Sequence, residues 1–555
     1  MNPFESIQHD LITHLSATYS LTNEQQAAIV TTINDESKKR GFGDLSTNAA
    51  LVIAKTQGKA PRTIAEEITT QFHHPSVSEL TIAGPGFINI ALTPAAFTEC
   101  SHALFTAGAS FFSENTNTPR PAYSIEFVSA NPTGPLHLGH GRGGIIGDVL
   151  GTILKFLGYP TTKEFYINDA GKQIQTLGLS FKARCQQALG ITGIEVPEDG
   201  YAGTYLVEMA ETLITSNKSD IQNALEKGDD NFFALYAKDV LLKQIQTTLK
   251  NYHINFDVWF SEKTLHDDGS VEKALTTLID RGHAFTQDGA LWFRSTEFGD
   301  DKDRVLKRSN GEVTYVAADV AYMLNKLNRG AEKLIFVLGQ DHHSYVSRLK
   351  GVMAALGHNP DNLDVILYQL VTLKEDGVAL RMSKRAGRIV SLEEIIETVG
   401  ADVARFFYLN RKADAHLDFD LGLALKKTDE NPVFYIQYAY VRTKSIFEKA
   451  AEHPELHNIT INDLTILDEE ERQLLKKIVA LKTLLHSITQ NYQVHLLSYY
   501  AIELANQFHS FYAAHRVIEI TNIPQSRKRL ALVQILQNTF ALSFELLGIS
   551  CPEKM

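Results

Sequence analysis

Residues 123–167 contain the sequence feature that most constrains the fold of this 555-residue chain. A strand-like apolar segment (123–130) leads into a Pro/Gly turn (131–135), a long helix-like segment (136–159) and a second strand-like segment (162–167). This order is typical of a β-α-β unit, in which the helix connects two parallel strands. We therefore expect an α/β chain built around a Rossmann-like parallel sheet.

The chain is too long for one domain, because domains usually span roughly 100–200 residues. Residues 114–122 are polar and contain two prolines, which indicates a boundary, and amphipathic helical patterns fill the last part of the chain. We expect a small α/β N-terminal domain at 1–115, a Rossmann-like domain at 116–400 with a largely helical insertion at about 175–310, a connecting segment at 401–430 and an all-α bundle at 431–555.

Within the N-terminal domain, residues 23–40 have apolar residues at helical spacing and predict a helix. A second helix is expected after Gly43, with Asp44 or Ser46 as its N-cap.

Composition excludes several classes of protein. Hydrophobic residues make up 44% and charged residues 21%, which is ordinary for a globular protein and argues against disorder. The net charge of −12 is not that of an overall basic nucleic-acid binder, although it leaves room for a local basic groove. Three cysteines without a CxxC pair, and no long apolar run, favour a cytoplasmic protein that does not span a membrane.

The densest chemical signal is PTGPLHLGHGRGG at 132–144. His137 and His140 lie one turn apart at the expected start of a helix, where free N–H groups and the helix dipole favour phosphate. Gly139 between them allows a nucleotide to approach the backbone. The segment therefore predicts a nucleotide site.

Three other interpretations of this segment remain open. The two histidines are often plain surface residues at such a position, or they are metal ligands that lack an apparent third ligand. The third interpretation is a dinucleotide fingerprint, GxGxxG followed by an acidic residue, carried by Gly139, Gly141, Gly144 and Glu164. In that fingerprint the glycines form the strand-to-helix turn, whereas here NPTGPLHL intervenes.

A second signal is the cation-rich segment KEDGVALRMSKRAG at 374–387, which follows the last expected strand of the sheet. Lys384 within it is placed to neutralise the charge that develops on a polyphosphate. A solvated basic loop is the simpler explanation of this segment taken alone.

Taken together, HLGH and MSK resemble the two signature sequences of class I aminoacyl-tRNA synthetases. The segments EFVSANPTGPLHLGHGRGGIIGD, FYINDAGKQI, FDVWFSE, TYVAADVAY, GQDHH and GADVARFFYL resemble, in their order, those of the arginyl-tRNA synthetase family. GDLSTNAAL and GPGFINI resemble that family's additional tRNA-contacting domain, and the last 125 residues resemble its anticodon-binding domain. One departure is that Arg381 and Arg385 replace the first Lys and the final Ser of the second signature.

This resemblance implies an arginine–tRNA ligase that forms arginyl-adenylate from arginine and ATP with Mg²⁺, then transfers arginine to the 2′-OH of the terminal adenosine of tRNA(Arg). It implies His137, His140 and Lys384 as catalytic residues. It implies an ATP site of His137, Gly139, His140, Met382, Ser383 and Lys384. We expect a cytoplasmic monomer without a dedicated protein metal site.

The resemblance also implies an arginine site. Glu262 and Asp319 would face the guanidinium group, with Tyr315 one helical turn before Asp319. The α-amino and carboxylate end would be held by Glu126, Asn131 and Gln340. Without the motifs, each of these would be explained as an ordinary surface or core residue.

The helical bundle offers aromatic residues to stack on unpaired bases and cations to meet phosphates. The candidates are Tyr435, Tyr438, Tyr440, Tyr499, Tyr512, Arg442, Lys444, Arg516 and Arg527–Arg529. Most of the tyrosines recur at helical spacing, for which core packing is the usual reason. Competing functions are another class I synthetase and a non-catalytic RNA-binding relative.

Overall fold

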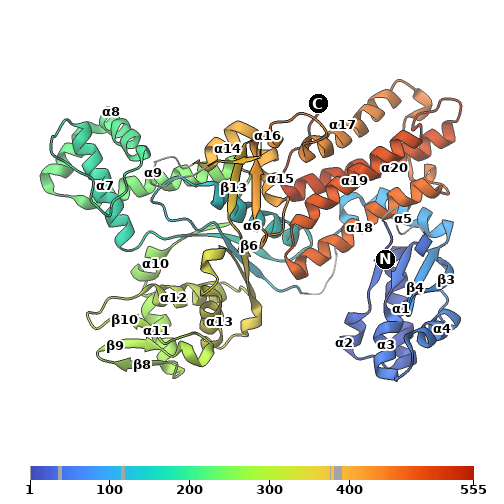
Figure 1. Cartoon of the computed structure of the whole chain (residues 1–555), viewed down its shortest axis with the longest axis horizontal. Coiled ribbons are helices and arrows are strands. Elements are labelled where there is room, and N and C mark those ends of the chain that lie inside the picture. Colours follow the sequence, from blue (N-terminus) through green and yellow to red (C-terminus); the bar gives the residue numbers. More distant parts are fainter. Residues whose placement is uncertain (1, 36–40, 114–118, 376, 381–389) are drawn as a thin grey trace. The chain divides into compact units, whose positions relative to one another are not determined.

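The computed structural model describes residues 2–35, 41–113, 119–375, 377–380 and 390–555. The chain forms two compact units (Figure 1). The first unit comprises Met1–Asn115, Lys427–Asn491 and Leu496–Met555, and the second comprises Thr116–Lys426 and Tyr492–His495.

The second unit is built on a five-stranded parallel sheet, which confirms the expected fold class. In spatial order its strands are β12 (Leu363–Tyr368), β11 (Lys333–Gly339), β5 (Tyr123–Phe127), β6 (Thr161–Ile167) and β7 (Val258–Ser261). The first strand of the chain, β5, has β6 on one side and β11 on the other. The strand order therefore reverses at β5, and in such sheets ligands bind outside the carboxyl ends of the strands at this point.

Helix α6 (Leu138–Phe156) connects β5 to β6 and packs closely on the sheet. A Cβ added at Gly147 would lie 2.3 Å from the ring of Phe127, and one at Gly143 would lie 2.6 Å from the ring of Tyr368. Only glycine allows this approach, so the small residues of GRGGIIGD act in packing.

A buried ion network fixes α6 further along its length. Asp148 forms ion pairs with Lys163 on β6 at 2.8 Å and with Arg405 on α15 (Ala401–Leu409) at 2.7 Å. Burial alone would raise the pKa of Asp148, but the charges of Arg405 and Lys163 lower it below its usual value. The network ties the helix that starts with HLGH to the sheet and to α15.

The segment at about 175–310, expected to be a largely helical insertion, is helical in its first part but also contains strands. It begins with an arm of three helices, α7 (Lys172–Ala188), α8 (Thr204–Lys227) and α9 (Asp230–Asn251), which share a core of their own. The chain then returns to the main sheet as β7, because VWFS pairs with β6. A four-residue strand gives too short a pattern to be read from the sequence.

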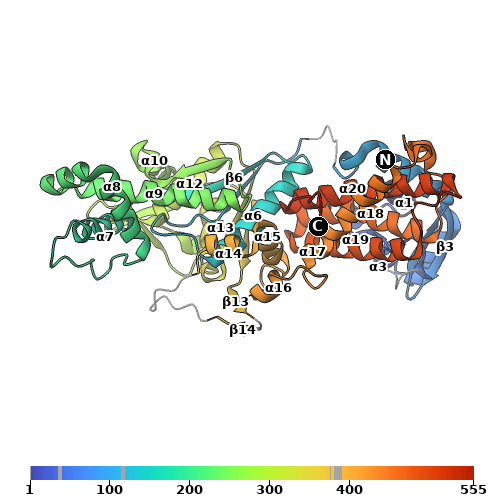
Figure 2. The same cartoon turned by 90° about the horizontal axis from the view of Figure 1, so that it is seen from above.

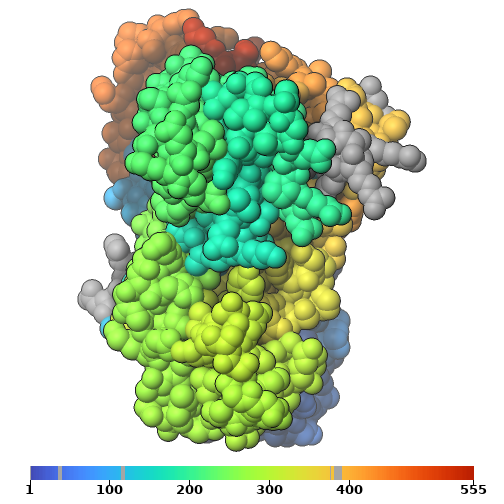
Figure 3. All heavy atoms as spheres, turned by 90° about the vertical axis from the view of Figure 1, so that its left-hand side faces the viewer, coloured from blue at the N-terminus to red at the C-terminus, as the bar shows by residue number. Residues whose placement is uncertain are grey.

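After β7 the chain forms a second, smaller α/β layer. Figure 3 shows the arm in teal and green and this layer in yellow-green. Its elements are α10 (Glu262–Asp267), α11 (Ser270–Asp280), the antiparallel strands β8 (Ala284–Gln287), β9 (Ala290–Phe293) and β10 (Arg304–Lys307), α12 (Tyr315–Asn328) and α13 (Tyr345–Ala355).

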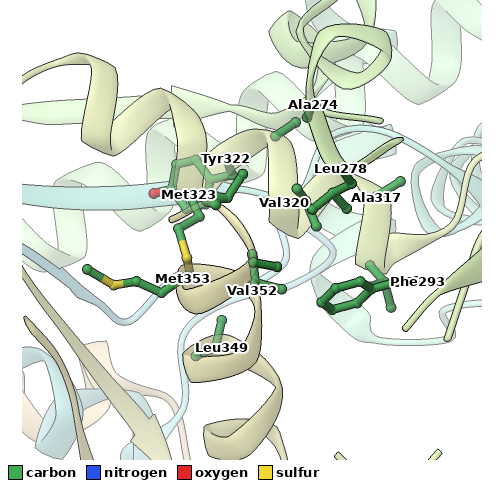
Figure 4. Packing of buried hydrophobic residues seen from close by; sticks show 14 of the residues in the cluster. Ala274, Leu278, Phe293, Ala317, Val320, Tyr322, Met323, Leu349, Val352 and Met353 are labelled. Atoms are coloured by element: carbon green, nitrogen blue, oxygen red, sulfur yellow. The ribbon is translucent and has the colours of Figure 1, made fainter. Parts of the chain in front are cut away.

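Helix α12 is held by apolar contacts on several sides (Figure 4). Its residues Ala317, Val320 and Met323 are buried with Leu278 of α11 and Val352 of α13. This core fixes one face of α12. The polar residues on the rest of the helix, Asp319 among them, are therefore held in place as well.

A third sheet of the second unit has the order β14-β13-β15. Its strands, with the helices that follow the main sheet, are β13 (Val371–Glu375), β14 (Val378–Ala379), α14 (Leu392–Val399), β15 (Leu417–Asp420) and α16 (Leu421–Ala424). Strand β15 lies inside the segment that the sequence suggested to be a helical connection.

The first unit combines an N-terminal α/β part with a C-terminal helical bundle. The N-terminal strands pair antiparallel in the order β1-β2-β4-β3. The N-terminal elements are α1 (Pro3–Tyr19), α2 (Asn23–Ala28), β1 (Thr31–Ile33), β2 (Leu45–Thr47), α3 (Ala49–Gln57), α4 (Pro61–Gln71), β3 (Val77–Ala83), β4 (Phe87–Leu92) and α5 (Pro94–Ala107).

Four long helices form the bundle, and they run side by side in Figures 1 and 2. They are α17 (Pro432–Ala450), α18 (Glu469–Asn491), α19 (His495–Ala514) and α20 (Ile523–Leu547). Within the described part of the chain, α20 is long and apolar enough to cross a membrane, but most of it is buried inside the unit, as a core helix would be.

Candidate active site

The two histidines of HLGH are ordered by the backbone of the helix they begin. His137 is the N-cap of α6, and its side chain accepts a hydrogen bond from the N–H of Gly139 through Nδ1 at 3.2 Å. The Nδ1 of His140 in turn accepts the N–H of His137 at 3.1 Å. The two rings stack with centroids 3.7 Å apart. Because each Nδ1 accepts a hydrogen bond, each neutral ring carries its proton on Nε2.

Burial keeps His140 uncharged. Burial, together with the smaller effect of the nearby His137, lowers the pKa of His140 to about 3. At neutral pH the ring of His140 therefore offers a neutral N–H donor at a helix start, which suits a phosphate oxygen.

The chain that follows the MSK segment returns to this helix start. The N–H of Leu392 donates to the carbonyl of Leu136 at 2.9 Å, and Ser391 forms a β-bridge with His137. On the other side, the N–H of Leu380 donates to the carbonyl of Leu373 on β13. The predicted site residues Met382, Ser383 and Lys384, with Arg381 and Arg385, lie outside the described residues.

Three of the predicted arginine-site carboxylates share one region at the carboxyl ends of the parallel strands. Glu126 is on β5, Glu262 directly follows β7, and Asp319 is on α12. Tyr166 of β6 faces all three: burial raises its pKa well above the usual value, and the charges of Glu262, Asp319 and Glu126 raise it further. The fold thus brings together residues that are almost 200 positions apart.

Glu262 is buried, with 4% of its surface exposed. Burial raises the pKa of Glu262 to about 7, although a hydrogen bond with Tyr166 opposes this shift. The side-chain amide of Asn168, in its favoured orientation, donates to Oε2 of Glu262 at 2.9 Å. The ring of His266 lies 3.8 Å from Oε1.

Asp319 has a similar electrostatic setting. Burial raises the pKa of Asp319 to about 7, and the charge of Glu262 adds to this effect. The hydroxyl of Tyr345 donates a hydrogen bond to Oδ2 of Asp319, and the positive charge of Arg348 also favours the ionised form. Two carboxyl groups that titrate near neutrality form a receptor for a cation with several N–H donors.

Glu126 is also buried and has a cationic neighbour. Its Oε1 accepts a hydrogen bond from Ser129 at 3.2 Å, and its Oε2 lies 3.3 Å from Nζ of Lys326. The backbone at Val128 and Ser129 has φ values of 65° and 41°, a strained region for a β-branched residue such as valine. Such strain often accompanies a functional turn.

The other residues predicted for the arginine site are more exposed than Glu126 and Glu262. Tyr315 is the first residue of α12 and is 61% exposed. Gln340 begins a short 3₁₀ helix directly after β11, and Asn131 lies in the turn after β5, exposed, 3.2 Å from the side-chain amide of Asn168.

The dinucleotide interpretation does not fit the structure. Gly139, Gly141 and Gly144 are all within α6 instead of forming the turn before it. Glu164 is fully buried, where it pairs with Lys326 at 2.9 Å and Arg329 at 2.6 Å. Its carboxylate is therefore not open to a ribose. Among the described residues no group of three His, Cys, Asp or Glu side chains is placed to hold a metal ion.

Comparisons with known proteins decide between the remaining interpretations. Residues 113–413 match the model of the catalytic domain of class I tRNA synthetases (R), residues 5–92 match the arginyl-tRNA synthetase N-terminal domain, and residues 436–555 match the DALR anticodon-binding domain. The chain belongs to the arginine–tRNA ligase family. It is thus a class I ligase, which confirms the resemblance seen in the sequence and sets aside the nicotinamide interpretation.

Individual relatives match this chain over nearly their whole length. The chain is 42% identical to the arginine–tRNA ligase of Anoxybacillus flavithermus, covering 96% of this chain and 95% of that one. It is 40% identical to arginine–tRNA ligase 1 of Halalkalibacterium halodurans, covering 99% of both.

Two solved structures share the fold at lower identity. The arginyl-tRNA synthetase of Thermus thermophilus is 22% identical, with a TM-score of 0.77 and complete coverage of both chains. That of Plasmodium falciparum is 19% identical, with a TM-score of 0.76, and covers 99% of this chain and 98% of its own.

Sequence reasoning missed several residues that shape the site. Tyr166, Asn168 and Asp169 lie within FYINDAGKQI, so the motif itself was the available signal. Asp169 accepts hydrogen bonds from the hydroxyl of Ser261 at 2.7 Å and the N–H of Lys263 at 3.0 Å, and so holds the start of α10. Tyr345 has no spacing relation to the carboxylates, and although Lys326 lies two helical turns after Asp319 on α12, only the fold brings it to Glu126.

Proposed function

We propose that this ligase forms arginyl-adenylate from arginine and ATP at the carboxyl ends of the main sheet, then transfers arginine to the 2′-OH of the terminal adenosine of tRNA(Arg). AMP and pyrophosphate are released. The observation that carries the proposal is the cluster of Glu126, Glu262 and Asp319 near the carboxyl ends of the parallel strands, with Glu126 on β5, where the strand order reverses. The start of α6, with His137 and His140, comes directly after β5, the strand that carries Glu126.

The ATP side of the site would be formed by the start of α6. The Nε2–H groups of His137 and His140 would donate to phosphate oxygens, and Gly139 would let the nucleotide lie against the backbone. Met382, Ser383 and Lys384 are proposed to complete the site, with Lys384 neutralising the leaving pyrophosphate. Mg²⁺ would arrive with ATP, since nucleotide-bound Mg²⁺ needs few protein ligands.

No covalent enzyme intermediate is required. The carboxylate of arginine attacks the α-phosphorus directly, the bond to the β-phosphate oxygen breaks, and pyrophosphate leaves with the electron pair. Positioning and charge stabilisation supply the catalysis, as in other phosphoryl transfers. Neutral His140 fits this role, because it donates a hydrogen bond without taking up a proton.

The arginine side would use the three carboxylates. Glu262 and Asp319 would accept hydrogen bonds from the planar guanidinium, with Tyr315 beside it. Glu126, Asn131 and Gln340 would hold the α-amino and carboxylate groups, so that the reacting carboxylate points toward the start of α6.

The tRNA would be recognised in part by the helical bundle. The guanidinium of Arg442 lies 4.6 Å from the ring centroid of Tyr438 and 5.0 Å from that of Tyr512. The ring of His509 lies tilted beside those of Tyr435 and Tyr438, with centroids 4.9 Å and 6.0 Å away. Both partners of Arg442 are more than a third exposed. An exposed group of aromatic rings around a cation is suited to stacking on unpaired bases.

Other candidates in the bundle have internal partners. Tyr440 is buried against Phe544, and Arg527 is bonded to Asp463 at 2.7 Å. Arg529 is paired with the buried Glu471. These residues stabilise the bundle, and the proposal therefore rests on the group around Arg442. We further propose that the enzyme is a cytoplasmic monomer without a membrane partner.

Pyrophosphate exchange tests the proposed function. The family resemblance implies that adenylate formation needs bound tRNA, so labelled pyrophosphate should enter ATP with arginine and tRNA together but not with arginine alone. Exchange without tRNA would contradict the proposed order of events. The absence of exchange under both conditions would contradict the proposed chemistry.

A further inference from the structure

Lys326 is a buried cation directly beneath the carboxylate cluster. It lies on α12 and is 1% exposed. Its Nζ is 3.3 Å from Oε2 of Glu126, 2.9 Å from Oε1 of Glu164 and 3.2 Å from the hydroxyl of Ser124. A buried lysine is costly unless it is paired, so these contacts fix the position of its charge.

The two carboxylates that share Lys326 differ in their other partners. Glu164 has a second cation, Arg329, at 2.6 Å, and it also accepts a hydrogen bond from the hydroxyl of Tyr322. Glu126 has Lys326 as its cationic partner, and it accepts hydrogen bonds from the hydroxyls of Ser129 and Tyr322. Glu126 therefore depends on Lys326 more than Glu164 does.

Most of the other groups that face Glu126 disfavour its negative charge, whereas a hydrogen bond from the hydroxyl of Tyr322 favours it. Burial raises the pKa of Glu126, and the charge of Glu164 on β6 raises it further, whereas Lys326 opposes both. Asp319 of α12 adds another negative neighbour, while the hydroxyls of Tyr322, Tyr166 and Tyr345 face the group from α12, β6 and α13. Removing the positive charge would leave a carboxyl group that holds its proton more firmly.

Lys326 does not itself reach the ligand. Its Nζ lies 4.4 Å from the ring centroid of Tyr322 and 5.5 Å from that of Phe336, and these rings close it off. Any effect on arginine must therefore pass through a neighbouring group, and of the two carboxylates paired with Lys326 it is Glu126 that belongs to the proposed arginine site.

We propose that Lys326 is a positioning residue that keeps Glu126 in place as the ionised acceptor for the α-amino group of arginine. This inference rests on the role proposed above for Glu126. It predicts a selective defect: without Lys326, binding of the α-amino group should suffer while binding of the guanidinium group should not.

The test compares two ligands on the full-length protein. One is arginine, and the other is 5-guanidinopentanoic acid, which is arginine without its α-amino group. Dissociation constants are measured by calorimetry for wild type and Lys326→Gln, whose amide keeps hydrogen-bonding capacity without the charge. The preference for arginine over the des-amino ligand should fall about tenfold or more, the order expected for one charge-assisted hydrogen bond. Lys326→Arg should restore part of it.

Arg329→Gln is the matched control. It removes a cation from the same helix that pairs with Glu164 but not with Glu126. Its ligand preference should equal that of wild type. If Lys326→Gln weakens both ligands equally, Lys326 is only structural and the inference is overturned.

Two further variants separate the possible failures. Glu126→Gln should reduce the same preference; if it does not, the proposed role of Glu126 is wrong, and the inference falls with it. If Glu126→Gln reduces the preference but Lys326→Gln does not, only the inference fails. Should Lys326→Gln bind neither ligand, the double variant with Glu164→Gln also removes the second carboxylate that Lys326 pairs with, and the same ratio of dissociation constants decides.

Discussion

At the scale of single residues, the proposed arginine site should carry protons that its ligand must displace. Glu262 and Asp319 both have a pKa raised to about 7 by burial. Near neutral pH each is partly protonated in the empty protein. A guanidinium group stays charged throughout this range and pairs best with ionised carboxylates.

Arginine binding should therefore tighten as the pH rises. Below pH 7 the carboxyls of Glu262 and Asp319 are protonated, and above it they are free to accept hydrogen bonds from the guanidinium group. We expect the dissociation constant to fall by about tenfold or more between pH 6 and pH 8, measured by calorimetry. Glu262→Gln should flatten this dependence, and Asp267→Asn, a largely exposed carboxylate on the same helix, should leave it unchanged. A pH-independent constant for wild type would contradict these raised pKa values.

Asp319 should also decide between arginine and citrulline. Citrulline has nearly the same shape but no charge, so a carboxylate left facing it loses its ionic partner, at a cost on the order of 3–5 kcal/mol. The ratio of kcat/KM for arginine to that for citrulline should fall at least tenfold in Asp319→Asn. Equal discrimination by the variant and wild type would show that Asp319 does not contact the guanidinium group.

The sequence could predict the residues that lie in motifs, but not those whose place depends on packing between distant elements. Glu126, Glu262 and Asp319 lie in motifs, and the structure brings them together as expected from those motifs. The predicted roles themselves stay predictions. Lys326 and Tyr345 could not be predicted, because their contacts with Glu126 and Asp319 depend on how α12 and α13 pack.

At the scale of elements, α6 carries the proposed ATP-site residues His137 and His140 at its start. Its buried Asp148 should therefore be sensitive to substitution. Removing one partner of a buried pair leaves the others uncompensated, so Asp148→Ala should lower the free energy of unfolding by about 3–5 kcal/mol.

Lys155→Ala is the control for this prediction. Lys155 lies on the same helix and pairs with Asp257, but both side chains are about 40% exposed, so its loss should cost about 1 kcal/mol or less. Urea unfolding followed by circular dichroism measures both variants. Similar losses in the two would mean that the buried network contributes no more than a surface pair.

The elements also show where sequence periodicity misleads. The β-α-β unit at 123–167 was predictable because its strands and its helix are long. The helix predicted at 23–40 was wrong, since α2 ends at Ala28 and the β-branched Thr31–Ile33 forms β1. Asp44 does not cap α3, but accepts the N–H of Leu92 in the sheet. Both differences arise because these residues join the antiparallel sheet, which the local sequence pattern does not show.

At the scale of the whole molecule, the proposed catalytic residues and the proposed tRNA-contacting group belong to different compact units. The site residues are in the second unit, and the exposed group around Arg442 is in the first. A substitution in this group should affect tRNA without affecting arginine.

Arg442→Gln should raise the KM for tRNA by about fivefold or more, the order of one lost stacking contact, with arginine binding unchanged. Lys449→Gln, a change of equal charge at an exposed position of α17, should have a smaller effect. Steady-state charging with varied tRNA gives both values. Equal effects of the two variants would indicate general electrostatic attraction instead of a specific contact.

Charging of total tRNA with each of the twenty amino acids, with ATP and Mg²⁺, tests the central claim most directly. We predict that labelled arginine becomes attached to tRNA and that no other amino acid does, lysine included, because lysine lacks the planar donor group that Glu262 and Asp319 would recognise. Attachment of a different amino acid, or no attachment of arginine by the folded protein, would contradict the account.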